Sequence, residues 1–145
     1  MVKRKFAVLA LVISALVLSG CSNPSDAASY KSGKITIERL QESVSAILDE
    51  RVKFQASPEG ALTGEALTLN QLEFHVFTAL LTQAAKERNI TATAAEVAES
   101  RAEVLKNVGS EDQLSLALVN AGIASIDLNQ YLSLIVLQDK LRTVI

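Results

Sequence analysis

Apolar residues recur along most of the chain at three- and four-residue steps, which is the period of an amphipathic helix. The clearest stripe contains Leu72, Val76, Leu80 and Leu81 and predicts a helix over residues 67–88 with one apolar face. Similar stripes predict helices over residues 37–53, 94–108, 110–121 and 127–145. We therefore expect an all-α fold, a compact bundle of about five helices.

Local signals mark the corner between the second and third of these helices. Asn89 can adopt the left-handed conformation that ends a helix, and Ile90 is placed to fold back as an apolar plug. Thr93 and Glu96 then form a capping-box pattern that predicts the start of the next helix.

Strand signals are weak outside these helices. Ile35 and Ile37 are compatible with a very short strand, but no other segment is an obvious partner for it. Residues 54–66 contain Pro58, Gly60 and Gly64 and are predicted to form a loop.

The first twenty residues have the pattern of an export signal. A basic start at residues 3–5 precedes an apolar run over residues 6–18, and Leu18-Ser19-Gly20-Cys21 resembles the lipobox of a bacterial lipoprotein. The alternatives are a plain secretory signal or an uncleaved anchor, although a run of thirteen residues is short for a spanning helix. We expect residues 1–20 to be removed and Cys21 to be lipidated.

This interpretation divides the chain into three parts. Residues 21–32 are rich in Ser and Ala and are expected to be a flexible tether from Cys21, and residues 33–145 are expected to form the helical domain. Such a protein would lie outside the cytoplasm, on the outer face of the bacterial cell membrane or on the outer membrane of a double-membraned cell. Cys21 is the single cysteine, so no disulfide can form within one chain.

Charge excludes some partners. The whole chain has a formal net charge of −2. Without residues 1–20, three of the 14 basic residues are lost and all 16 acidic ones remain, so the mature chain is near −5. It contains no Lys/Arg cluster, so nucleic acid and anionic headgroups are not expected partners. Attachment to the lipid bilayer would depend on the acyl chains of Cys21.

The residues that usually carry out catalysis are sparse. His75 is the single histidine, and the pattern offers it neither a nucleophile elbow nor further ligands at metal spacing. Glu96, Glu99 and Glu103 share a helix face that is better explained as solvated surface than as a metal site. Gly-rich phosphate loops are also absent from the sequence. We expect no enzyme activity, cofactor or metal, and a structural or surface role for His75.

Several segments together resemble one family. The segment Leu80-Leu81-x-x-Ala84-Ala85-Lys86-Glu87-Arg88-Asn89-Ile90-Thr91-Ala92-Thr93-x-x-Glu96-Val97 is similar to the helix–corner–helix of the SurA/PrsA-type chaperone N-terminal domain. Two shorter segments, Gly33-Lys34-Ile35-Thr36 and Leu116-x-Leu118-x-x-Ala121-Gly122-Ile123, also resemble that domain, so the likeness spans about residues 30–145. Asn89 replaces the Gly that is usual there. The parvulin-type isomerase domain of full-length relatives is not found in this sequence, so isomerase activity is not expected.

The resemblance implies a domain that binds unfolded or nascent exported polypeptides without catalysis. The predicted last helix is apolar around most of its circumference, so it is either the central helix or leaves one face for a dimer contact or a client groove. We expect a client groove to be lined by Phe74, Phe77, Leu132, Ile135, Val136 and Leu137. The alternative function is a cell-envelope structural adaptor that dimerises or docks on one specific partner protein.

Overall fold

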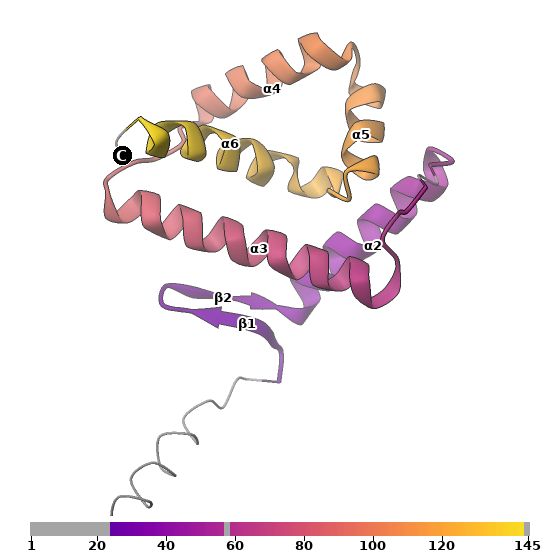
Figure 1. Cartoon of the computed structure of the whole chain (residues 1–145), viewed down its shortest axis with the longest axis horizontal. Coiled ribbons are helices and arrows are strands. Elements are labelled where there is room, and N and C mark those ends of the chain that lie inside the picture. The colour runs from indigo at the N-terminus through magenta and orange to yellow at the C-terminus, as the bar shows by residue number, and fades with distance from the viewer. Residues whose placement is uncertain (1–23, 57–58, 144–145) are drawn as a thin grey trace, which may run out of the picture.

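Five α-helices and one small hairpin make up the part of the chain that the computed structural model describes, residues 24–56 and 59–143 (Figure 1). The elements in order are β1 (Asp26–Tyr30), β2 (Gly33–Thr36), α2 (Ile37–Lys53), α3 (Gly64–Glu87), α4 (Ala94–Val108), α5 (Glu111–Asn120), the 3₁₀ turn η1 (Ser125–Asp127) and α6 (Leu128–Arg142). The prediction of an all-α bundle of about five helices is confirmed.

Helix α6 lies between α3 and α4, and α5 closes a triangle with α4 and α6 (Figure 1). The hairpin packs against α3, and α2 crosses near the N-terminal half of α3. Segments from both ends of the chain therefore meet at α3.

Local capping accounts for the helix ends. Asn89 has a φ of 57°, and the Ile90 amide donates to the Ala85 carbonyl at 2.9 Å. The Thr93 side chain accepts from the Glu96 amide at 3.3 Å, while Glu96 accepts from the Thr93 amide at 2.8 Å. Both the helix stop and the capping box are as predicted. Helix α3 begins at Gly64, so the predicted loop over residues 54–66 is shorter than expected.

The apolar core is built around α6. Its side chains pack with α4 and α5 at one end and with α3 at the other; the buried ones are Leu128, Leu132, Leu134, Leu137 and Leu141. A second, smaller cluster joins α2 to α3 through Ile47 and Leu67. The interpretation of the last helix as the central one is consistent with this burial.

The expected tether over residues 21–32 is wrong for residues 26–30, which form strand β1. This strand pairs antiparallel with β2, from Asp26 opposite Thr36 to Tyr30 opposite Gly33. An isolated two-stranded hairpin is marginally stable, and this one is held by contacts to the helices. Ser32 Oγ donates to Gln83 on α3 at 3.0 Å.

The strand partner that the sequence did not reveal is therefore β1. Its sequence, Asp-Ala-Ala-Ser-Tyr, lacks the β-branched residues by which strands are recognised. Gly33 lies under the Tyr30 ring, where an added Cβ would stand 2.8 Å from the Tyr30 hydroxyl oxygen.

The predicted signal peptide and the lipidation site Cys21 lie outside the described residues. Within the described ranges, the helices are too short or too polar to cross a membrane.

Candidate functional site

The residues predicted to line a client groove do not form one surface. Leu132 and Leu137 are buried, with 0% and 4% of their surface exposed, so their assignment to a groove is corrected to core. Phe74, Ile135 and Val136 are partly buried. Phe77 is half exposed and is the one residue of the set that a large partner can reach.

Helix α3 presents an apolar face to solvent. Leu69, Phe77 and Leu80 expose 51%, 50% and 51% of their surface, and at 100° per residue they fall within an arc of about 80°. They span about 17 Å along the helix axis at about 1.5 Å per residue. Glu73, the single charged residue of this helix between residues 66 and 84, is exposed and lies in the middle of the same arc, between Leu69 and Phe77. We call Leu69, Phe77 and Leu80 the α3 outer face.

The buried side of α3 is unusually polar. Gln71, His75 and Thr78 are buried there, while Leu80 of the apolar stripe is half exposed. The side chain of Gln71 donates to the Gly122 carbonyl at 2.6 Å, and Thr78 donates to the Phe74 carbonyl at 2.7 Å. These partners satisfy the Gln71 amide nitrogen and the Thr78 hydroxyl, although Gln71 Oε1 is buried without a hydrogen-bond partner, and the helix turns apolar side chains outward.

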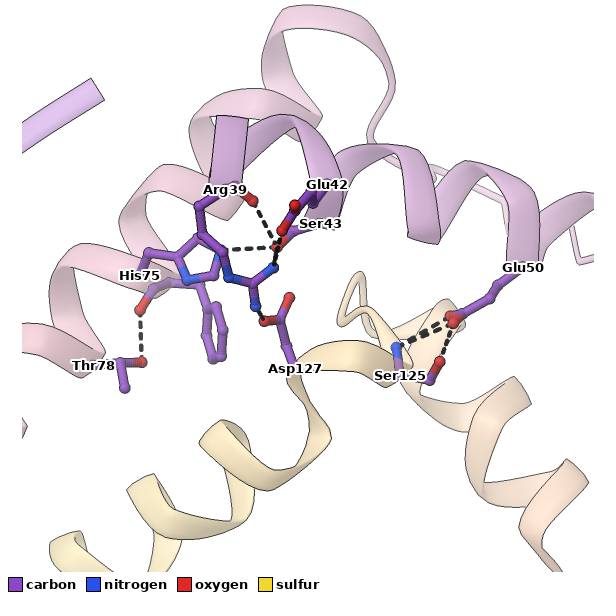
Figure 2. Close-up of polar contacts among 9 residues, drawn as sticks. Arg39, Glu42, Ser43, Glu50, His75, Thr78, Ser125 and Asp127 are labelled. Atoms are coloured by element: carbon purple, nitrogen blue, oxygen red, sulfur yellow. Dashed lines mark hydrogen bonds and ion pairs between the residues drawn. The ribbon is translucent and has the colours of Figure 1, made fainter. Parts of the chain in front are cut away.

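His75 belongs to a polar network that joins α2, α3 and η1 (Figure 2). Its Nε2 shares a hydrogen bond of 2.9 Å with Ser43 Oγ, which also accepts from Arg39 Nη1 at 3.2 Å. The other terminal nitrogen of Arg39 forms an ion pair with Asp127, whose side chain is completely buried. Figure 2 shows these side chains converging from separate elements.

A second contact fixes η1 against α2. The Ser125 amide donates to Glu50 Oε1 at 3.2 Å, as seen in Figure 2. Asp127 stands at the N-cap position of α6, but its side chain makes no capping hydrogen bond and turns to Arg39 instead.

Ser43, His75 and Asp127 are neighbours, but their geometry differs from that of a catalytic triad. In a triad the acid holds the imidazole, whereas here Asp127 binds Arg39. Ser43 is completely buried and so is closed to a substrate. Burial lowers the pKa of His75 below its ordinary value of 6.5; the charge of Asp127 opposes this shift and that of Arg39 reinforces it. The network is best explained as a buried clamp between elements.

A pocket lies above this clamp. It has a volume of about 520 Å³ and is bounded by the hairpin, the start of α2, α3 and α6. Arg39 and His75 contribute to its wall, together with Lys34, Thr78 and Lys86. The sequence did not reveal this pocket, because its lining residues come from segments far apart in the chain. The one local signal was that the polar residues Gln71, His75 and Thr78 recur at three- and four-residue steps on α3.

The described part of the chain holds no cluster of three or more His, Cys, Asp or Glu side chains that could bind a metal ion. No protein-family model matches the chain, and no curated protein or solved structure shows a significant similarity to it. The resemblance to the SurA/PrsA-type N-terminal domain therefore stays a prediction, and the fold and the two surfaces above are the basis for the function proposed next.

Proposed function

We propose that this protein is a lipid-anchored, extracytoplasmic chaperone-like domain that binds non-native exported polypeptides without catalysis. The observation that carries the proposal is the α3 outer face. Contiguous apolar surface on a soluble domain is typical of an interaction site, while single exposed apolar residues are ordinary. Three large exposed side chains share one helix face, with Phe77 and Leu80 one turn apart and Glu73 between them and Leu69, and this grouping supports the first interpretation.

The dimensions of the α3 outer face suit an extended client. Its length of about 17 Å corresponds to about five residues of extended chain at about 3.4 Å each. Apolar contacts on either side of the single carboxylate of Glu73 would bind apolar segments with little regard to sequence. Broad recognition of unfolded chains is what a holdase requires.

The position of the hairpin also bears on this proposal. Strand β1 begins at Asp26, five residues after Cys21, and five extended residues reach at most about 18 Å. A lipid on Cys21 would therefore keep the folded domain close to the membrane surface. That location favours clients that are emerging from the membrane.

The test measures aggregation of two or three unrelated unfolded secreted proteins by light scattering, with the purified protein at modest excess. We expect the wild type to suppress scattering and the Phe77→Gln variant to be markedly weaker. Ile126→Gln is the matched control, because Ile126 is 55% exposed but lies on η1, away from α3. Circular dichroism checks that both variants keep their helices.

Two results would contradict the proposal. The first is a lack of suppression with every substrate, and the second is equal suppression by wild type and Phe77→Gln. Capture of one partner at a fixed stoichiometry, without general suppression, would instead favour the structural adaptor. That adaptor could use the same face, since a straight apolar row on a helix is also a surface on which another helix packs.

A further inference from the structure

The pocket between the hairpin, α3 and α6 has a charge of one sign on its walls. Its charged lining residues are Lys34, Arg39 and Lys86, and no carboxylate contributes to the lining. This contrasts with the acidic character of the chain as a whole, whose sequence pI is about 5.4. A concave site with cationic walls favours an anionic group.

The acidic partners of two of these cations stand behind the wall. Asp127 pairs with Arg39 and is completely buried, and Asp26 pairs with Lys34 at 2.9 Å and is nearly buried. Within the described residues, Lys86 forms no ion pair. The three cations therefore line the pocket, and the carboxylates of Asp127 and Asp26 lie on the protein side of it, while Glu42, 3.5 Å from Arg39, is exposed outside the lining.

Arg39 is held in place before any ligand arrives. Its Nη1 atom donates to Ser43 at 3.2 Å and lies 3.5 Å from a Glu42 carboxylate oxygen, while Nη2 pairs with Asp127. A guanidinium group has five N–H donors, so these contacts leave donors for a further acceptor. A cation that is already oriented loses little conformational freedom on binding.

The remaining walls offer hydrogen-bond donors and a small apolar area. Hydroxyl and amide groups come from Tyr30, Thr36, Thr82, Gln83, Gln130 and Ser133. Ile35 and Ala79 add apolar surface beside them. The volume of about 520 Å³ is within the usual range for a ligand pocket, about 300–1,000 Å³.

We propose that this pocket binds the C-terminal carboxylate of a polypeptide, with Arg39 and Lys86 contacting the carboxylate and the Ile35–Ala79 side receiving the last side chain. This inference rests on the proposed function and deepens it, because it assigns one end of a client to a second site apart from the α3 outer face. Guanidinium and ammonium groups are the usual partners of a carboxylate. Capture of a chain terminus is a recognised mode of peptide binding.

The experiment titrates the purified protein, by calorimetry, with an N-acetylated hexapeptide that has uncharged side chains and a free C-terminal carboxylate. The probe for comparison is the same peptide with a C-terminal amide. We expect the carboxylate form to bind at least tenfold more tightly, and the difference to shrink as salt is added. Lys86→Gln should weaken binding of the carboxylate form severalfold and leave the amide form unchanged.

Lys106→Gln is the matched control, because Lys106 is an exposed lysine on α4 that does not line the pocket. Lys86 is itself exposed and outside the core, so its substitution is expected to leave the fold intact, which circular dichroism checks. Equal affinity for the acid and amide peptides, or equal affinity of wild type and Lys86→Gln for the acid, overturns the assignment. Absence of binding at millimolar peptide overturns it as well.

Succinate serves as a third probe that separates a chain terminus from a free small carboxylate. Displacement of the peptide by succinate at equal concentration overturns the assignment to a chain terminus. The two proposals fail separately. Loss of aggregation suppression in Phe77→Gln concerns the α3 outer face, whereas the difference between acid and amide peptides concerns the pocket alone.

Discussion

Replacement of Leu132 by Ala tests how much the buried centre of α6 contributes to stability. Leu132 is completely buried and packs with Leu114, Leu118 and Leu128. The substitution removes three carbon atoms, which at about 0.8 kcal/mol for each buried group accounts for about 2.4 kcal/mol. The unfilled space adds to this, so the expected total is about 3 to 4 kcal/mol.

This loss is a large share of the stability of a small domain, which is typically about 5–15 kcal/mol. The assay is urea unfolding followed by circular dichroism, with the free energy of unfolding extrapolated to water. Phe77→Ala is the matched control, because Phe77 is half exposed. This substitution removes less buried apolar surface and should lower the free energy of unfolding by less than about 1.5 kcal/mol. A loss below about 1 kcal/mol for Leu132→Ala would refute the assignment of Leu132 to the core.

The buried polar groups and the helix caps lead to three further predictions. Because burial lowers the pKa of His75, the unfolded chain binds a proton at a pH where the folded chain does not. The free energy of unfolding should therefore be constant above about pH 6.5 and fall below it. His75→Gln should remove this pH dependence from urea midpoints measured from pH 8 to 5. The hydrogen bond from Lys140, with those from Thr93, lowers the pKa of Glu96 to about 2, so its stabilisation is present above pH 4.5 and is lost as the pH falls through about 2. The Glu96→Gln variant should lack that loss in urea midpoints measured from pH 5 down to pH 2. Arg39→Met leaves the carboxylate of Asp127 buried without a cation and should lower the free energy of unfolding by about 3 to 5 kcal/mol in urea. The double variant Arg39→Met, Asp127→Leu should recover most of this loss. Equal stability of the single and double variants would contradict the buried clamp.

The α3 outer face illustrates how far sequence reasoning can go. The periodicity of Leu72, Val76 and Leu80 correctly indicates a helix, and it indicates that one of its faces is apolar. It does not indicate which face packs. In the fold, Leu80 is half exposed, while Gln71 and His75 on the other side are buried. That choice depends on partners from distant segments, Ser43 on α2 and the Gly122 carbonyl after α5, which no local pattern contains.

The sequence by itself determined the helices and the corner between α3 and α4. The left-handed Asn89 and the Thr93–Glu96 capping box act through groups within a few residues of each other, so a local pattern is sufficient to predict them. Only the tertiary structure decided that the weak β1 segment would pair with β2, that Asp127 would bind Arg39 instead of capping α6, and that cations from the hairpin, α2 and α3 would share one pocket. These features depend on interactions between residues far apart in the chain, whose gain in free energy exists only once the elements have packed.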